Sequence, residues 1–386
     1  MRQSRRQATE ARQRTACRYP QPFLFFPRAL AYPAIRLRAQ ASPCVSRIAS
    51  VRPMERSDII AIGASAGGIE ALRTLVATLP SGLPASLLIA QHLSPTSPGM
   101  LPEILDRAGP LAAVSAQDEE TLEPAKIYVA PPDRHLLVGE DGRLRLSRGP
   151  KENLARPAID PLFRSAALVF GPRLIGVVLT GYLDDGTAGL QAIKLCGGAA
   201  IVQDPKEALA PGMPSSALKN VHVDYCLPLV EIGPQLVRMI AEPARPQVDK
   251  PRDLAAELAI FAGGAGSIET LKQIGEPTAL TCPECHGALT LLQGERPARF
   301  RCHTGHAFTE QALLAGLAEN TETAFWSAMR CLQEEAILKR HMAAHSIIGG
   351  ADAEALLKDA DEAMAAADRV RIIQENYAKR RPRRDG

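Results

Sequence analysis

Between residues 58 and 202, short apolar runs alternate with turns and helix-like segments, and this alternation constrains the fold more than any other feature of the sequence. The runs that have the length of buried strands are residues 58–63, 86–90, 126–130, 174–179 and 199–202. After the first run, apolar residues recur at helical spacing from Ile69 to Leu79, and a further helix is predicted over residues 188–195. Strands that alternate with helices predict an α/β fold with a doubly wound, mainly parallel sheet.

Polar side chains that can do chemistry follow three of these runs. Ser65 follows the first run, His92 follows the second, and Asp184 and Asp185 follow the fourth. Ligands of doubly wound sheets bind just beyond the carboxyl ends of the strands, so we expect these side chains to converge. A serine hydroxyl becomes a nucleophile when a base accepts its proton, an imidazole suits that role, and a carboxylate can orient the imidazole.

The predicted nucleophile lies in the sequence GASAGG, at the junction between a strand and a helix. There the backbone N–H groups of Ala66 and Gly67 would lie at the positive end of the helix and could donate to a developing oxyanion. Glycine-rich turns of this kind also cradle phosphates, so a phosphate-binding protein is an alternative for this motif. A dinucleotide site would have an acidic residue at the end of the second strand, where Gln91 and His92 stand instead.

His222 is a rival for the catalytic base, because α/β-hydrolases order their triad as serine, acid and histidine. It lies inside the strand-like run of residues 221–223 and is interpreted as a structural histidine. The order of serine, histidine and acid therefore remains the favoured one.

Five motifs in order make residues 56–240 resemble the catalytic domain of the chemotaxis protein-glutamate methylesterases (CheB-type). The motifs are GASAGG, IAQH, YVAPPDRHL, RPAIDPLFRSAA and LTGYLDDGTAG. The resemblance implies a cytoplasmic hydrolase of γ-glutamyl methyl esters on chemoreceptors, which needs no cofactor for catalysis and can also deamidate certain receptor glutamines. It implies the triad Ser65, His92 and Asp185, with Asp184 at the variable position of the acid motif.

The sequence departs from the family pattern at three places. Tyr182 and Leu183 replace the usual Met-Gly beside the predicted acid, and Ala66 replaces a common threonine after the nucleophile. Residues 1–53 are too short for the phosphorylatable receiver domain that usually precedes the catalytic domain. We therefore expect a stand-alone form, with a catalytic domain over residues 54–242.

The charge of the chain is unevenly distributed. The formal net charge is +3, yet residues 1–53 hold 11 Arg, no Lys and one acidic residue (Glu10), which gives +10 and leaves −7 for the rest. A mildly acidic body gives no reason to expect nucleic-acid binding. The first 53 residues are interpreted as a disordered leader or as residues ahead of a true start at Met54; a targeting segment is the alternative.

A cluster of cysteines and a histidine predicts a metal site after a linker at residues 243–275. Cys282, Cys285, Cys302 and His306 form the pattern C-x2-C-x16-C-x3-H, which suits a closed tetrahedral zinc site in a zinc-ribbon-like module over residues 276–310. His286 and His303 are rival fourth ligands, and a redox C-x-x-C is the alternative reading. Thiol ligands of this kind indicate a reducing compartment, and the closed shell indicates a structural ion.

The last part of the chain predicts a helical hairpin over residues 311–380, followed by a basic tail over residues 381–386. Two apolar stripes separated by Gly349-Gly350 carry this prediction; their members include Leu314, Ile337 and Leu357. We expect the stripes to pack mainly on each other, with self-association or receptor contact as the alternative. No apolar run approaches the ~18 residues that a membrane helix needs, so membrane insertion is not expected.

The leading hypothesis is thus a serine esterase acting on methylated glutamates of a receptor-like protein. A non-catalytic regulatory scaffold, which recruits partners through the zinc module and the hairpin, is the main alternative from another class. Tyr182 and Leu183 make this alternative credible, because they change the surroundings of the predicted acid.

Overall fold

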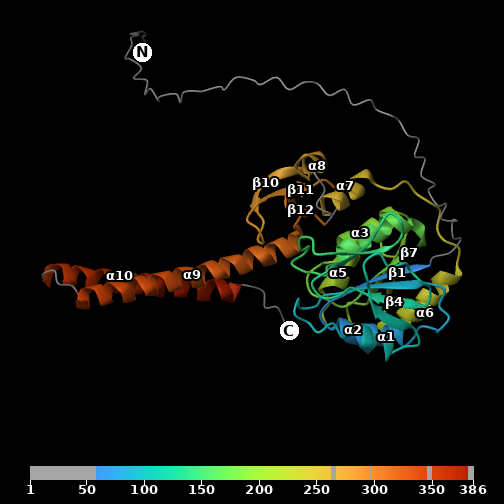
Figure 1. Ribbon diagram of the computed structural model, residues 1–386, viewed down its shortest axis with the longest axis horizontal. Coiled ribbons are helices and arrows are strands. Elements are labelled where there is room, and N and C mark those ends of the chain that lie inside the picture. Colours follow the sequence, from blue (N-terminus) through green and yellow to red (C-terminus); the bar gives the residue numbers. More distant parts are fainter. Residues whose placement is uncertain (1–57, 262–266, 295–296, 346–349, 381–386) are drawn as a thin grey trace, which may run out of the picture. The chain divides into compact units, whose positions relative to one another are not determined.

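We describe the chain from a computed structural model, which covers residues 58–261, 267–294, 297–345 and 350–380 (Figure 1). The predicted leader over residues 1–53 and the predicted basic tail over residues 381–386 lie outside this range. Among the described helices, none is both long and apolar enough to cross a membrane.

A seven-stranded parallel sheet forms the centre of the first domain, in the order β3-β4-β2-β1-β7-β8-β9. Its strands are β1 (Ile59–Ala64), β2 (Ser86–Gln91), β3 (Ala112–Ser115), β4 (Lys126–Val129), β7 (Leu174–Val178), β8 (Ala199–Gln203) and β9 (Tyr225–Leu227). The predicted α/β class with a doubly wound parallel sheet is confirmed. The strand order reverses between β1 and β7, the point at which such sheets bind ligands.

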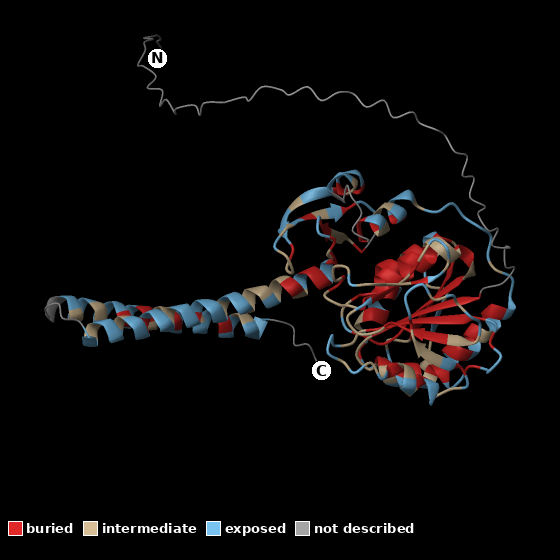
Figure 2. Ribbon diagram, in the orientation of Figure 1, coloured by how far each residue is buried: buried red, intermediate tan, exposed pale blue. Residues whose placement is uncertain are grey.

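Helices cover both faces of this sheet, and buried residues fill its strands (Figure 2). One face packs against α1 (Gly68–Val76), α2 (Leu101–Asp106) and α6 (Leu229–Ala241). The other face packs against α3 (Ile159–Phe170), α4 (Thr187–Leu195) and α5 (Gly212–Asn220), and the short helix η1 (Gly171–Arg173) leads into β7. Two separate apolar clusters therefore hold the sheet rigid between two helical layers.

The sequence did not predict two edge strands and a hairpin. β3 and β9 are short and only partly buried, so they lack the continuous apolar run that marks a central strand. The hairpin of β5 (His135–Val138) and β6 (Leu144–Ser147) packs outside the main sheet. The run around His222 is not a strand; it follows α5, and His222 is exposed there.

A second, four-stranded antiparallel sheet follows, in the order β10-β11-β12-β13. Its strands are β10 (Gly275–Thr281), β11 (Ala288–Leu292), β12 (Arg299–Cys302) and β13 (Ala307–Thr309). Part of the predicted linker at residues 243–275 differs from the expectation, because α7 (Arg252–Phe261) and α8 (Ser267–Ile274) lie within it. Phe261 in α7 is fully buried, so this helix packs as part of the fold.

Four charged side chains form a fully buried network between the first domain and the second sheet. Arg301 of β12 donates to Glu152 at 2.6 Å and to Glu257 at 2.9 Å, and Arg164 of α3 bonds Glu152 from the other side. All four side chains are at most 3% exposed. Burial alone would raise the pKa of Glu257, but the neighbouring guanidinium groups of Arg164, Arg299 and Arg301 hold it below its usual value. Both carboxylates are therefore ionised and paired.

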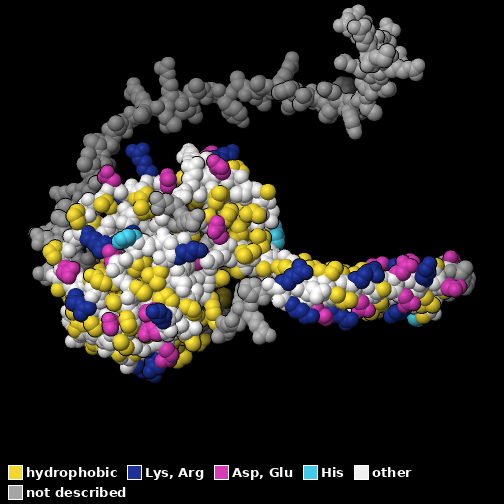
Figure 3. Space-filling model, turned by 180° about the vertical axis from the view of Figure 1, so that it is seen from behind, with side chains coloured by type: hydrophobic (Ala, Val, Ile, Leu, Met, Phe, Trp, Pro, Cys, Tyr) yellow, Lys and Arg dark blue, Asp and Glu magenta, His cyan; other side chains and the backbone are white. Residues whose placement is uncertain are grey.

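The predicted helical hairpin is formed by α9 (Glu310–His345) and α10 (Gly350–Arg380). Its buried contacts are made chiefly by small residues, Ala336, Ala360 and Ala363. The expectation that the apolar stripes pack on each other is only partly met, because Leu314 is 69% exposed and Ile337 is 64% exposed. Hydrophobic side chains lie among charged ones along the hairpin surface (Figure 3).

The buried charge network generates a stability prediction. Arg301→Ala removes the guanidinium that forms ion pairs with both Glu152 and Glu257. Each of these buried carboxylates then lacks one of its positively charged partners. Breaking such a buried pair typically costs about 3–5 kcal/mol, so we expect a large loss in denaturant unfolding. The control Arg330→Ala breaks the exposed pair with Glu334 on α9 and is expected to change nothing measurable. Equal unfolding midpoints for the two variants would contradict this account.

Candidate active site and cysteine–histidine cluster

Ser65, His92 and Asp185 lie together beyond the carboxyl ends of three adjacent strands. Ser65 follows β1, His92 follows β2, and Asp185 lies in the loop between β7 and α4. The His92 Nδ1 atom is 3.0 Å from the Ser65 Oγ, and its Nε2 atom is 2.7 Å from the Asp185 Oδ2. One imidazole thus contacts both a hydroxyl and a carboxylate.

The hydrogen-bond partners of His92 indicate which of its two ring nitrogens carries the hydrogen. An ionised carboxylate can only accept, so the Nε2–H of His92 donates to Asp185. The Nδ1 atom then carries the lone pair and can accept the Ser65 hydroxyl proton. This is the arrangement that general-base activation of a serine requires. His92 is partly accessible, with 21% of its side chain exposed, whereas Asp185 is 2% exposed.

Several donors surround the buried Asp185 carboxylate. Its Oδ2 atom also accepts the Ile159 N–H at 2.7 Å, and its Oδ1 atom accepts the Asn153 side chain at 2.8 Å and the Gly186 N–H at 3.0 Å. Burial alone would raise the pKa of Asp185, but the hydrogen bonds and charge of His92, together with the Ile159 and Asn153 donors, hold it below its usual value. The carboxylate is therefore ionised despite its burial.

The pKa values of the two neighbouring aspartates, Asp160 and Asp184, shift in the opposite direction. Burial and the adjacent Asp185 charge raise the pKa of Asp160 well above its usual value. Burial raises the pKa of Asp184 to about 6, although a hydrogen bond from the Thr309 hydroxyl at 2.6 Å opposes this rise. Asp184 thus points toward the second sheet, and only Asp185 of the two predicted candidates contacts His92.

The turn that carries Ser65 is fixed by contacts with the β7 loop. The Ser65 N–H donates to the Thr180 carbonyl at 2.9 Å, and the Thr180 hydroxyl donates to the Ala66 carbonyl at 2.9 Å. Gly67 has a φ of 75°, which glycine adopts without strain. Within the described residues, the N–H groups of Ala66 and Gly67 have no hydrogen-bond acceptor, as the predicted oxyanion donors require.

Sequence reasoning missed two residues that hold this site. Gln91, the buried last residue of β2, donates to the carbonyls of Ser65 at 2.8 Å and His92 at 3.0 Å. A buried polar residue at the end of an apolar strand was the available signal. Asn153 contacts Asp185 from a loop, and nothing in its sequence context distinguishes it from a turn residue.

Leu183, which stands where the family pattern usually has glycine, has a φ of 59°. This backbone conformation favours glycine over leucine.

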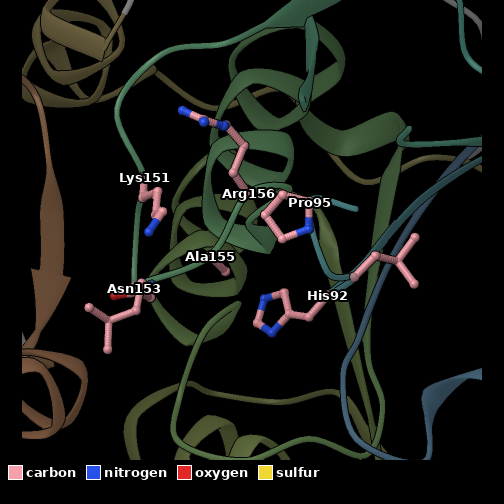
Figure 4. A pocket seen from close by; sticks show the side chains of 8 residues that line it. His92, Pro95, Lys151, Asn153, Ala155 and Arg156 are labelled. Atoms are coloured by element: carbon pink, nitrogen blue, oxygen red, sulfur yellow. The ribbon is translucent and has the colours of Figure 1, made fainter. Parts of the chain in front are cut away.

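A pocket of about 360 Å³ opens beside His92. Lys151, Asn153, Ala155 and Arg156 come from one loop and lie opposite His92 across the pocket (Figure 4). The two cations of this loop are paired within the chain, Lys151 with Glu284 at 3.1 Å and Arg156 with Asp133 at 2.7 Å.

The predicted metal ligands Cys282, Cys285, Cys302 and His306 also come together, with ligand atoms that all lie within 4.8 Å of one another. Cys282 and Cys285 belong to the turn between β10 and β11, Cys302 is the last residue of β12, and His306 lies in the turn between β12 and β13. The rival ligands His286 and His303 are exposed and stand outside this cluster. The four residues offer the donor set of a site that could hold a metal ion.

Comparisons with known proteins agree with the motifs. The CheB methylesterase family profile matches residues 60–236. A putative protein-glutamate methylesterase/protein-glutamine glutaminase of Leptospira interrogans is 41% identical over 182 residues, which are 47% of this chain and 94% of that protein. Protein-glutamate methylesterase/protein-glutamine glutaminase 1 of Paramagnetospirillum magneticum is 39% identical over 48% of this chain and 50% of that protein.

A solved structure also aligns with the chain. The crystal structure of the Thermotoga maritima CheB methylesterase catalytic domain is 33% identical and covers 48% of this chain and 99% of that structure, with a TM-score of 0.46. The full-length relative from the same organism is 34% identical, and the aligned region spans 58% of its length.

The raised pKa of Asp184 generates a prediction about pH. The folded protein binds the Asp184 proton more tightly than the unfolded chain, so stability decreases as the pH rises from 3.8, the usual value, to about 6. We expect Asp184→Asn to be more stable than wild type above pH 6, by on the order of 1–3 kcal/mol, and nearly equal to it near pH 4. Unfolding free energies at both pH values test this. A destabilised Asp184→Asn at pH 8 would contradict the expectation.

Proposed function

The chain belongs to the CheB methylesterase family, and from that premise we propose that it hydrolyses γ-glutamyl methyl esters by a Ser65–His92–Asp185 mechanism. The observation that carries this proposal is the pair of hydrogen bonds from one imidazole, to the Ser65 hydroxyl at 3.0 Å and to the Asp185 carboxylate at 2.7 Å.

In this mechanism the Ser65 oxygen attacks the ester carbonyl carbon while His92 Nδ1 accepts the hydroxyl proton. The N–H groups of Ala66 and Gly67 donate to the oxyanion that forms. When the tetrahedral intermediate collapses, methanol leaves with the proton from His92, and Ser65 holds the acyl group. A water molecule, deprotonated by His92, then releases the carboxylate and restores Ser65. Asp185 keeps the imidazole oriented and stabilises its positive charge throughout.

The proposed substrates are methylated glutamates of a chemoreceptor-like protein, and glutamine side chains are the second class. The names of the relatives support both reactions, because they pair methylesterase with glutaminase activity. The pocket beside His92 lies next to the proposed nucleophile and would receive the substrate side chain. Because the chain spans about half the length of several of these relatives, the activity of the whole protein is part of the proposal.

We also propose that the hairpin of α9 and α10 makes a protein contact, either with a second copy of the chain or with the receptor. Its exposed apolar side chains support this. They are Leu314, Trp326, Ile337, Leu338, Met342, Leu357, Ile372 and Ile373.

For the cysteine–histidine cluster we propose zinc in a structural role. Tetrahedral zinc with Zn–S bonds of ~2.3 Å and Zn–N bonds of ~2.0–2.1 Å holds two sulfurs ~3.8 Å apart and a sulfur and a nitrogen ~3.6 Å apart. The Sγ atoms of Cys285 and Cys302 are 3.7 Å apart, and the Cys302 Sγ is 3.6 Å from the His306 Nδ1. When bound, the ion would cross-link the two turns of the second sheet. The four protein ligands leave no position for a substrate.

The nucleophile generates the first functional prediction. Ser65→Ala should lower methanol release from methyl-labelled receptor membranes by at least about 10³-fold, because among the described residues no other hydroxyl is bonded to His92. The fold should be unchanged, as judged by circular dichroism. Ser81→Ala replaces an exposed serine after α1 and serves as the matched control, which should retain full activity. Undiminished methanol release by Ser65→Ala would rule out this mechanism and favour the regulatory scaffold.

The cysteine–histidine cluster generates the second functional prediction. Protein purified without chelators should contain about one zinc per chain by elemental mass spectrometry, and chelation should lower its melting temperature. Cys302→Ser should lose most of the metal. Cys331→Ser, which replaces an exposed cysteine of α9, should keep it. If protein purified without chelators contains no zinc, and chelation leaves its melting temperature unchanged, the proposed zinc site is wrong.

A further inference from the structure

On the premise of the proposed function, we propose that Asn153 is a positioning residue that turns the Asp185 carboxylate toward His92, and that β13 of the second sheet holds Asn153 in place. The second sheet would then contribute to the geometry of the active site by holding Asn153.

The side chain of Asn153 makes three hydrogen bonds that fix its orientation. Its amide nitrogen donates to the Asp185 Oδ1 at 2.8 Å and to the Asp160 Oδ2 at 2.9 Å. Its amide oxygen accepts the backbone N–H of Thr309 at 2.9 Å. A flipped amide would point its oxygen at two carboxyl groups and its nitrogen at another N–H, so only one orientation is favourable. Asn153 is 7% exposed, and water competes little for these bonds.

The backbone around Asn153 is held by the same strand. The Asn153 N–H donates to the Ala307 carbonyl at 2.9 Å, and residue 152 forms a parallel bridge with Ala307. The Glu152 side chain bonds Arg301 of β12. Asn153 has a φ of 50°, which asparagine tolerates better than most residues. Both the backbone and the side chain of Asn153 are therefore anchored to the second sheet.

The consequence for Asp185 follows from how its two oxygens are used. Oδ2 bonds His92 and the Ile159 N–H, while Oδ1 accepts from the Asn153 side chain and from the N–H groups of Gly186 and, at 3.3 Å, Asp160. Donors on Oδ1 stop the carboxylate from rotating, which keeps Oδ2 directed at the imidazole. The Asn153 donor is also one of the groups that hold the pKa of the buried Asp185 below its usual value. Losing it would make the carboxylate bind a proton more tightly.

Other charged and titratable groups face this carboxylate and remain in every variant of Asn153 and Thr309 proposed below. They are His92 after β2, Asp160 in α3, Asp184 beside it, His135 in β5, and, next to Asp160, Arg164 in α3. A change in pH behaviour on substituting Asn153 therefore reports the loss of its own donor.

The test measures how fast a fluorophosphonate phosphonylates Ser65 as the pH is varied, a reaction that needs the activated serine but not the natural substrate. Asn153→Ala and the similarly sized Asn153→Leu are expected to slow labelling by about 10–100-fold. Both should move the midpoint of the acid limb to higher pH by roughly 0.5–1 unit. The control Asn220→Ala removes an amide that bonds Ser216 within α5 and should leave rate and midpoint unchanged.

A second set of variants tests the link to the second sheet. Thr309→Pro removes the N–H that Asn153 accepts, and it should reproduce the shift of Asn153→Ala. Thr309→Val keeps that N–H while losing the hydroxyl, so its shift should be smaller. If both residues act through one contact, the double variant Asn153→Ala/Thr309→Pro should shift the midpoint no further than Asn153→Ala alone.

The outcomes separate this inference from the proposed function. Labelling of Ser65→Ala, or undiminished labelling of His92→Ala, would overturn the proposed function itself. If both variants block labelling but folded Asn153→Leu keeps the wild-type rate and midpoint, Asn153 only fills space and the positioning role is wrong. Fully additive shifts in the double variant would refute the link through Thr309. Circular dichroism and melting temperatures establish that each variant is folded.

Discussion

The buried charge of Asp185 is the interaction on which the candidate site depends. A carboxylate with 2% exposure is tolerated only when donors replace its water, since an unpaired buried ion costs several kcal/mol. Those donors come from separate parts of the chain: His92 after β2, Ile159 at the start of α3, Asn153 in the pocket loop, and Gly186 beside the carboxylate. This set of donors surrounds the carboxylate only in the folded chain, and the same contacts that stabilise its charge also orient the imidazole.

The number of hydrogen-bond donors also explains why three neighbouring aspartates have different pKa values. Asp160, Asp184 and Asp185 are all buried, and three ionised carboxylates so close together would repel one another. Asp185 gathers the most donors and has a lowered pKa, whereas Asp184 has one hydroxyl donor and a raised pKa. Asp185 is therefore the carboxylate that ionises most readily, and it is the one that bonds His92. Both aspartates follow the same strand and are equally buried, so their hydrogen bonds separate them, in agreement with the family motif that assigns the acid to Asp185.

What could be predicted from the sequence depended on how local the signal was. The central strands were predictable because each is an apolar run buried on both faces, and Ser65, His92 and Asp185 lie in the turns that follow such runs. The spacing of Cys282, Cys285, Cys302 and His306 was enough to predict that these four residues cluster. By contrast, β3 and β9 are short edge strands with exposed positions, and α7 lies in a segment whose proline content indicated a linker. Asn153 gave no signal, because its partner Thr309 is 156 residues away and the contact exists only after both domains have folded.

Three consecutive residues bind the pocket loop to the second sheet by three different kinds of contact. Glu152 forms buried ion pairs with Arg301, Asn153 accepts from the Thr309 backbone, and Leu154 packs against the apolar cluster that contains Cys282 and Cys302. Asn153 and Leu154 both have positive φ values, conformations that cost on the order of 1–2 kcal/mol for ordinary residues and persist only where surrounding contacts enforce them. The ion pair, the hydrogen bond and the apolar contact all anchor the same short segment, and Asn153 carries its position to Asp185. The Thr309 hydroxyl makes a second link, to Asp184 beside it. The cysteine–histidine cluster lies in the same sheet and contacts the pocket loop at Leu154, so it belongs to the same continuous set of contacts.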